Sequence, residues 1–372
     1  MNVQSSSATN LHKKDLRHFL NMNQFSKKEI LEWIELMKLL KDARTRNAVP
    51  QLFKNQSLGM IFQQNSTRTR VSFETAATLL GGHALMLGAG DIHLGKKETV
   101  EDTVEDTARV LARMVDVIMI RTDKYADIER FAEYSSIPII NAMSTDVHGD
   151  DTGNHPTQCL ADLLTMEEHL PRGKKLEDVT MVVVGDPSTP EVSLGYALSK
   201  LGATFKIISP EGYRLPQNVV DAIEANNKVS GGTFLQTTDI DEVKGADFVM
   251  AEEWCWGRTD EEIAQRDADF KPTYVVTMDL LEKAGPNALF MHVLPANAGN
   301  GRWPDEKEVT REVLESDRNL AWDEAENRLS AMMALLAYYG RPHFRVPDPE
   351  DIEYYDVKSK ELLSRIFDRR IS

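Results

Sequence analysis

Hydroxyl and arginine side chains gather at the start of a predicted helix, directly after an apolar strand. The run Ser66-Thr67-Arg68-Thr69-Arg70 follows LGMIF and QQN and precedes the helical pattern VSFETAATLL. The free N–H groups and positive dipole end of a helix N-terminus attract anions. Ser and Thr add hydrogen-bond donors, and Arg68 offers a planar fork that suits phosphate. The run therefore predicts a phosphate site. The alternative is an ordinary N-cap beside two surface arginines.

Two histidine motifs add groups that can meet a carbonyl or an NH2 group. His155-Pro156-Thr157-Gln158 opens another predicted helix, and His292-Val293-Leu294-Pro295 ends the predicted strand ALFMHVLP. A neutral imidazole can donate to a carbonyl oxygen that gains negative charge, and Gln158 can both donate and accept. Backbone carbonyls at the strand end can accept N–H bonds. The alternatives are a plain helix start and a plain strand-to-loop turn.

Two arginines complete the set. Arg121 closes the predicted strand VDVIMI, and Arg328 begins an apolar helix, where a buried guanidinium needs an anionic partner. All these motifs lie at the carboxyl ends of predicted strands or just beyond them. Ligands of open α/β sheets bind there, so the shared position favours one common site.

The elements that must position this site alternate between strand and helix, which predicts an α/β fold with parallel sheets. Predicted strands cover 58–62, 115–120, 138–140, 181–184, 205–208, 248–250, 274–277 and 289–293. Predicted helices cover 27–42, 67–80, 99–114, 161–169, 192–201, 218–226 and 309–315.

Length and pattern predict two domains, 1–154 and 155–324. A helix at 325–340 is expected to pack back on the first domain, and 341–372 forms a charged tail that is either a subunit-contact arm or a solvated segment. The repeated VEDT at 100–107 is interpreted as a helix lengthened by one turn. The segment 147–153 is interpreted as an insertion near the site.

Composition narrows the function classes. A net charge of −16 disfavours nonspecific nucleic-acid binding and favours a cationic substrate, although solubility alone also explains it. We find no apolar run of about 18 residues and no signal segment, so we expect no membrane association and a cytoplasmic location. The two cysteines, Cys159 and Cys255, form neither a disulfide framework nor a zinc spacing.

STRTR, HPTQ, H-x-L-P and an arginine in a C-terminal helix, in that order, resemble the aspartate/ornithine carbamoyltransferase family over roughly residues 25–340. The putrescine type is the most similar and the ornithine type comes next. The resemblance implies an active site between two parallel-sheet α/β domains, a homotrimer, and no metal or other cofactor. It places carbamoyl phosphate on Ser66, Thr67, Arg68, Thr69, Arg121, His155, Gln158 and Arg328, with His93 contributed by the neighbouring subunit.

The implied reaction is attack of an uncharged amine on the carbonyl carbon of carbamoyl phosphate. Arg121, His155 and Thr69 would meet the charge that grows on the carbonyl oxygen. Phosphate would leave while Arg68 and the helix end hold it. Arg121, His155 and Arg68 are thus the expected catalytic residues.

Departures from the family pattern concern the acceptor. Val293 stands where Cys or Pro is usual, the turn 185–191 lacks the Asn residues of the ornithine type, and Glu252 takes the place of an Asp. The stretch after Glu252 lacks the Ser-Met-Gly loop of the ornithine type, and it does not reproduce the putrescine-type loop either. The expected acceptor residues are Glu252, Trp254, His292, Val293 and Leu294.

These departures favour putrescine as the acceptor and hence a role in polyamine metabolism. Another amine or amide and, less favoured, ornithine remain alternatives. Packing is the alternative role for the tryptophans. A Rossmann dehydrogenase is disfavoured because GDPSTPEVSLG lacks the G-x-G-x-x-G spacing. A homologue that binds carbamoyl phosphate without turnover is the other rival, because of Val293 and the altered loop.

Overall fold

Two parallel sheets organise the chain in the computed structural model, which describes residues 16–88, 103–145, 152–299, 304–340, 353–354 and 356–360. The first sheet has the strand order β2-β1-β3-β4. Its strands are β1 (Ser57–Phe62), β2 (His83–Gly88), β3 (Val117–Thr122) and β4 (Ile139–Ser144). The strands β1, β3 and β4 are almost wholly buried, which explains their near-continuous apolar sequences.

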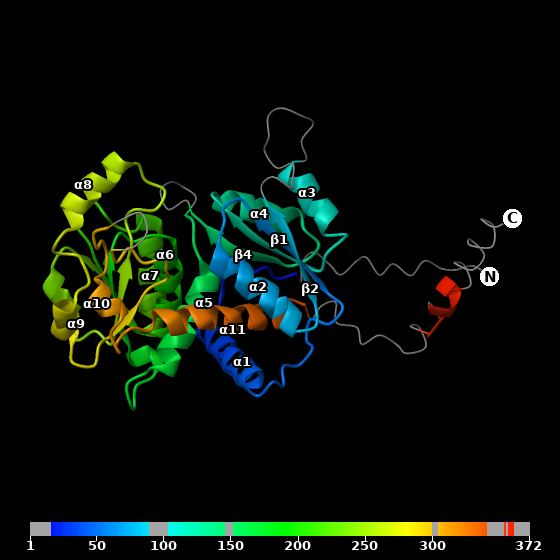
Figure 1. Cartoon of the computed structure of the whole chain (residues 1–372), viewed down its shortest axis with the longest axis horizontal. Helices are drawn as coiled ribbons and strands as arrows, with labels where there is room; N and C mark the ends of the chain where they lie inside the picture. The colour runs from blue at the N-terminus through cyan, green and yellow to red at the C-terminus, as the bar shows by residue number, and fades with distance from the viewer. Residues whose placement is uncertain are drawn as a thin grey trace.

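The second sheet has the order β7-β6-β5-β8-β9. Its strands are β5 (Thr180–Gly185), β6 (Thr204–Ile208), β7 (Thr233–Thr237), β8 (Phe248–Glu252) and β9 (Leu289–Met291). Figure 1 shows the two sheets side by side, with helices around each. In both sheets the strand order reverses beside the first strand, at β1/β3 and at β5/β8, and such a switch point opens a crevice at the carboxyl ends of the strands.

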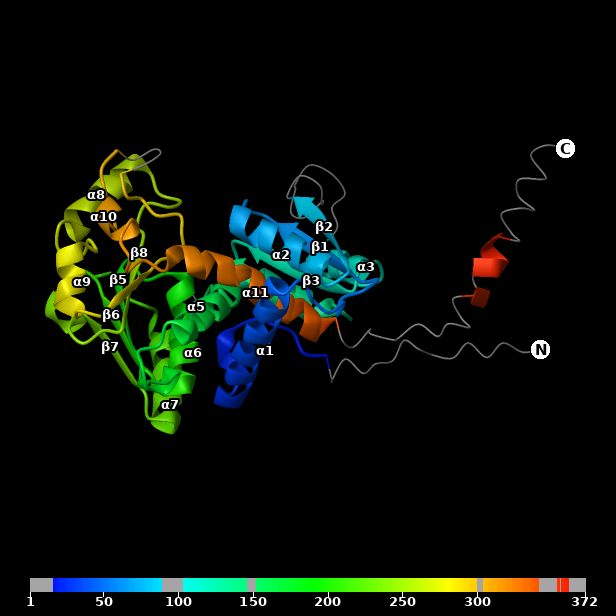
Figure 2. The ribbon, with the colours of Figure 1, turned by 60° about the horizontal axis from the view of Figure 1, so that its bottom comes forward.

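Helices cover both sheets, and one of them bridges the sheets. They are α1 (Lys27–Thr45), α2 (Thr67–Leu79), α3 (Val104–Leu111), α4 (Tyr125–Tyr134), α5 (Pro156–Glu168), α6 (Thr189–Leu201), α7 (Gln217–Ser230), α8 (Asp260–Phe270), α9 (Met278–Ala284), α10 (Arg311–Leu314) and α11 (Ala321–Tyr339). Helix α11 starts beside the second sheet and packs against α5, α2 and α1, as Figure 2 shows. None of the described helices combines the length and the apolarity that a bilayer crossing requires.

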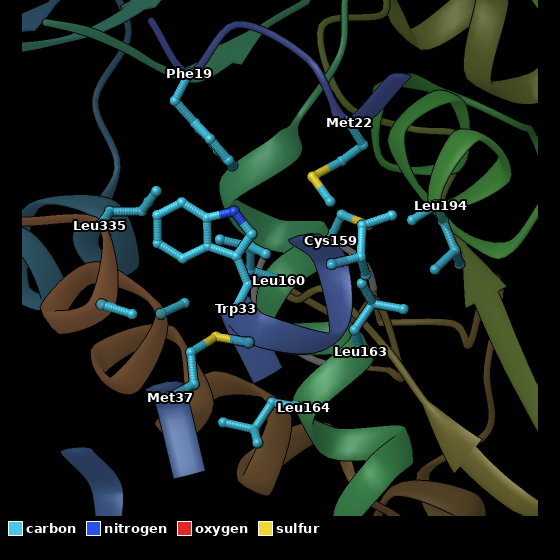
Figure 3. Packing of buried hydrophobic residues seen from close by; sticks show 14 of the residues in the cluster. Phe19, Met22, Trp33, Met37, Cys159, Leu160, Leu163, Leu164, Leu194 and Leu335 are labelled. Carbon is cyan, nitrogen blue, oxygen red and sulfur yellow. The ribbon is translucent and has the colours of Figure 1, made fainter. Parts of the chain in front are cut away.

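An apolar core fixes α1, α5 and α11 to one another. Figure 3 shows Trp33 and Met37 of α1 facing Leu160 and Leu164 of α5, with Leu335 of α11 on another side. The Trp33 ring also stacks on the ring of Tyr339, with ring centroids 6.3 Å apart. Helix α5 also packs against α6 and β4, so the division between residues 154 and 155 stays a prediction.

The sequence prediction of a strand at 274–277 is wrong. Val276 makes a single bridge to Val309, and Thr277 then caps α9 by accepting a hydrogen bond from the Leu280 N–H at 3.2 Å. The other predicted elements are present with shifted ends. The strands β2 and β7 and the helices α4, α8 and α9 were not predicted from the sequence.

Some predicted features fall outside the described residues. They include the first VEDT copy apart from Thr103, most of the segment 147–153, and the tail 341–372 except 353–354 and 356–360. Thr103 is the N-cap of α3, and its hydroxyl accepts a hydrogen bond from the Asp106 N–H at 3.1 Å.

Candidate active site

A cavity of about 450 Å³ lies where the carboxyl ends of strands from both sheets meet. It brings together most residues that the sequence singles out: Ser66, Arg68, Thr69, Arg121, His155, Gln158, Glu252, His292, Val293, Leu294 and Arg328. Thr67 and Trp254 do not line this cavity, and His93 lies outside the described residues. The cavity has a cationic end and an acidic end.

The N-terminus of α2 forms part of the cationic end. Ser66 is the N-cap, and its hydroxyl accepts a hydrogen bond from the Thr69 N–H at 3.3 Å and donates to the Thr69 hydroxyl at 3.0 Å. Ser66 is thus a cap and a cavity residue at once. Arg68 reaches across the cavity and donates to the Leu294 carbonyl, whereas Arg70 pairs with Glu74 on the surface. Only the first arginine of the motif belongs to the cavity.

Three guanidinium groups converge, and none of them forms an ion pair with a carboxylate of the described residues. Arg328 donates to the side-chain amide oxygen of Gln158 at 2.9 Å and to the Thr69 hydroxyl at 3.1 Å. Arg121 is buried, and its Nε has no hydrogen-bond partner among the described residues. Burial, together with repulsion from neighbouring arginines, lowers the pKa of Arg121 to about 10 and that of Arg328 to about 9. Because these groups stay charged at neutral pH, an anion is needed to compensate them.

His155 lies beside this cluster as the N-cap of α5. Its backbone N–H donates to the Ser193 hydroxyl at 2.9 Å, and its Nε2 lies 3.4 Å from Nη1 of Arg328. Burial and the nearby arginines hold the pKa of His155 well below its usual range. The imidazole is therefore neutral at pH 7 and can meet a carbonyl oxygen without adding a full charge.

The loop after β9 forms another wall. The His292 ring is fully buried, with Nε2 3.2 Å from Oε1 of Glu308 and Nδ1 accepting a hydrogen bond from the Leu294 N–H at 2.7 Å. These contacts engage both ring nitrogens, so His292 braces the loop. Val293 and Leu294, which belong to this loop, line the cavity.

Carboxylates form the acidic end. One Glu252 oxygen accepts a hydrogen bond from the Ser188 hydroxyl at 2.8 Å, while the other is buried with no partner among the described residues. Burial and the neighbouring Glu191 and Glu253 hold the pKa of Glu252 well above its usual range. A cation placed here would reverse that effect by favouring the ionised carboxyl group.

The two tryptophans of the altered loop take different places. Trp254 is 1% exposed, donates from Nε1 to Asp267 at 2.9 Å and stacks on Phe270 with ring centroids 4.6 Å apart. It lines only an adjoining pocket of about 230 Å³, while Trp256 lines both spaces and is 52% exposed. The role of Trp254 is therefore packing against Phe270.

Sequence reasoning missed several residues of the site. Met143, Ser188 and Asn297 line the cavity, and Asp162 and Glu324 lie directly behind it. Spacing held a signal for the last two, because Asp162 follows Gln158 by four residues and Glu324 precedes Arg328 by four. Residues four apart share a helix face.

Comparison with known proteins agrees with this architecture. Residues 17–168 match the model of the aspartate/ornithine carbamoyltransferase carbamoyl-P binding domain, and residues 177–339 match that of the Asp/Orn binding domain. The chain is 43% identical over 356 residues to a putrescine carbamoyltransferase of Mycoplasma mycoides subsp. mycoides, covering 94% of this chain and 93% of that protein.

Ornithine carbamoyltransferases are also similar. The chain is 39% identical to the enzyme of Caldicellulosiruptor saccharolyticus, covering 87% of this chain and 98% of that protein. Among solved structures, the ornithine carbamoyltransferase from Pyrococcus furiosus has a TM-score of 0.78 and 38% identity, covering 86% of this chain and 96% of the other.

Proposed function

The chain belongs to the aspartate/ornithine carbamoyltransferase family and is a carbamoyltransferase, and we propose that it carbamoylates putrescine at the expense of carbamoyl phosphate. The observation that carries the choice of acceptor is one buried oxygen of Glu252, which has no hydrogen-bond partner among the described residues and lies in a cavity whose other end is cationic. The products of the proposed reaction are N-carbamoylputrescine and phosphate.

We assign carbamoyl phosphate to the cationic end. The ligands are Ser66, Thr67, Arg68, Thr69, Arg121, His155, Gln158 and Arg328. The guanidinium groups of Arg68, Arg121 and Arg328 supply the charge that a phosphate group requires, and the α2 N-terminus supplies N–H donors. Thr67, the first residue of α2, contributes through its backbone N–H.

The reaction then follows from position. The free amine of the acceptor forms a bond to the carbonyl carbon, and the C–O bond to phosphate breaks with its electron pair going to phosphate. The proton that the amine nitrogen loses passes to the departing phosphate. Negative charge on the carbonyl oxygen is met by Arg121, by neutral His155 and by the Thr69 hydroxyl. Arg68 and the start of α2 hold the phosphate that leaves. Orientation and fixed electrostatics supply the rate enhancement.

Putrescine matches the acidic end because its second amine carries a positive charge and it has no α-carboxylate. We assign that ammonium group to Glu252, with Glu253 beside it and with Val293 and Leu294 forming the wall along the carbon chain. Arg258 favours ornithine as the second candidate. It lines the cavity, so its guanidinium is available to a carboxylate.

The test is a panel of acceptors with carbamoyl phosphate: putrescine, cadaverine, ornithine and small amides, with ureido product and phosphate measured together. We expect the highest kcat/KM with putrescine. Glu252→Gln should raise the KM for putrescine by about tenfold to a hundredfold, because a charge-assisted hydrogen bond is lost.

The matched control is Arg258→Ala. It should leave putrescine kinetics within about threefold, because putrescine has no anionic group, and it should lower any activity with ornithine. A higher kcat/KM with ornithine than with putrescine would overturn the proposed acceptor. Binding of carbamoyl phosphate without product from any acceptor would indicate a non-catalytic homologue.

A homotrimer in the cytoplasm, with His93 reaching the site of a neighbouring subunit, belongs to the same proposal. Its support is the family resemblance. A particle three times the 41.9 kDa chain mass in light scattering is the expected result. Mixing a His93→Ala chain with an Arg121→Ala chain should restore activity in hybrid particles, because some sites would then carry neither change.

A further inference from the structure

Two carboxyl groups lie behind the cavity and have no role in the chemistry described so far. Asp162 of α5 and Glu324 of α11 are both completely buried, and neither lines the cavity. An isolated ionised carboxylate at such depth is costly, so each group needs hydrogen bonds or a proton.

Gln158 connects both carboxyl groups to the cavity. Its Nε2 donates to Asp162 Oδ1 at 2.8 Å and to Glu324 Oε1 at 2.8 Å, which commits both hydrogens of the amide. Its carbonyl oxygen accepts one hydrogen bond from Arg328 and keeps a second lone pair. Toward a ligand, Gln158 can therefore act only as an acceptor, and the ligand must supply an N–H donor.

Burial also favours the protonated form of both carboxyl groups. Burial raises the pKa of Asp162 to about 7 and holds that of Glu324 well above its usual range, and the Asp162 charge raises the pKa of Glu324 further. The second oxygen of Glu324 accepts a hydrogen bond from the His292 N–H at 3.1 Å, which links the pair to the loop after β9.

We propose that Asp162 and Glu324 are positioning residues: they fix the Gln158 amide with its oxygen toward the cavity, and so make the site select a carbamoyl group over an acyl phosphate that lacks an N–H. This inference rests on the proposed placement of carbamoyl phosphate beside Gln158. The reverse orientation of the amide would set its NH2 against the Arg328 guanidinium and would withdraw both donors from Asp162 and Glu324.

Acetyl phosphate is the probe, because it has a methyl group where carbamoyl phosphate has NH2. Dissociation constants for carbamoyl phosphate, acetyl phosphate and inorganic phosphate are measured by calorimetry on the full chain. The preference for carbamoyl over acetyl phosphate should fall by about tenfold in Asp162→Ala, the cost of one misplaced hydrogen bond. The same fall is expected in Glu324→Gln, because both Glu324 oxygens accept hydrogen bonds, one from Gln158 and one from His292, and an NH2 group must replace one of them. Affinity for inorganic phosphate should stay within about threefold, because phosphate does not meet Gln158.

Asp162→Asn is the matched rescue. Its amide oxygen can still accept from Gln158 Nε2, so the preference should recover relative to Asp162→Ala. If Glu324→Gln does not fold, the Asp162 variants decide. An unchanged preference in Asp162→Ala, or an equal fall in affinity for all three ligands, overturns the inference. Failure of the unmodified chain to bind carbamoyl phosphate would instead remove the proposed function.

Discussion

At the scale of single residues, the site depends on unpaired positive charge. Arg68, Arg121 and Arg328 are gathered without carboxylate partners among the described residues, and each has a lowered pKa because it is buried. Such a cluster is costly to the folded apoprotein and is compensated when a phosphate group binds. Ligand binding should therefore stabilise this protein strongly.

The second arginine of the motif STRTR, Arg70, is a control for the role of the first, Arg68. Arg68→Ala should lower kcat/KM by about a hundredfold to a thousandfold, because it removes a charged donor from the phosphate site. Arg70→Ala, two residues away, removes a half-exposed side chain that pairs with Glu74 at 3.1 Å. That change should leave kcat/KM within about twofold. Steady-state kinetics with varied carbamoyl phosphate measure both, and equal losses in the two variants would refute the distinction.

The same two arginines show how far sequence reasoning reaches at this scale. The motif predicts an anion site, but the sequence alone gives no reason to choose between Arg68 and Arg70. Helix geometry separates them, since neighbours two apart point to different faces. Trp254 and Trp256 also look equivalent in sequence, and only the position of Phe270 and Asp267 decides which ring is packed away. Partners distant in sequence leave no local signal.

At the scale of elements, the close approach of β5 to β8 positions Glu252. Gly185 ends β5 with φ of 140°, and a Cβ built there would lie 2.1 Å from the Glu252 carbonyl oxygen. Gly185→Ala must push the strand ends apart, so it should lower the free energy of unfolding by about 3 kcal/mol. It should also raise the KM for the amine, because Glu252 moves.

Gly173 provides the comparison. Its φ is 88°, and a Cβ there would meet nothing within 4 Å. Gly173→Ala therefore carries the cost of a positive φ alone, about 1 kcal/mol, with unchanged kinetics. Urea unfolding and amine kinetics on both variants test the argument. Equal destabilisation would mean that conformation, and not the contact with Glu252, governs Gly185.

Strands were predictable where burial is complete and less so at the edges. The buried strands β1, β5 and β8 have continuous apolar sequences. The edge strands β2 and β7 are only half buried, and their mixed sequences resemble those of loops. At 274–277 the apolar sequence predicted a strand that does not form. The apolar residues of this segment pack in the core of the second sheet, but its backbone turns into α9. An apolar sequence indicates that a segment is buried, but it does not show that the segment pairs with a neighbouring strand.

At the scale of the whole molecule, the two sheets share one core around α1, α5 and α11. The helix α5 carries His155 and Gln158, and α11 carries Arg328, so the elements that join the two halves also carry the site. A rigid junction is expected to hold these groups in place. Of the proposed acceptor residues, Glu252 ends β8, and Val293 lies in the loop after β9, where it packs against the edge of this shared core.

Buried carboxyl groups throughout this junction should make stability depend on pH. Burial, with smaller contributions from Asp162 and Asp186, raises the pKa of Glu191 to about 7. Between about pH 4.5 and 7, the folded protein keeps this proton while the unfolded chain has lost it, so this group's stabilisation is lost as pH rises through that window. His18 and His155 act in the opposite direction below about pH 6.5, since burial lowers their pKa values.

Comparison with Glu191→Gln isolates the carboxyl contribution, because the amide can still accept the hydrogen bond from the Ser188 N–H and does not titrate. The free energy of unfolding of the variant, relative to the unmodified chain, should rise by on the order of 2 kcal/mol between pH 5 and pH 8. Urea unfolding at several pH values measures the difference. Putrescine should reduce this difference in unfolding free energy above pH 7. The positive charge of bound putrescine favours the ionised form of the carboxyl groups around Glu252. Parallel stability curves for the two proteins would show that Glu191 is ionised throughout, and the acidic end of the cavity would then need a different source of compensation.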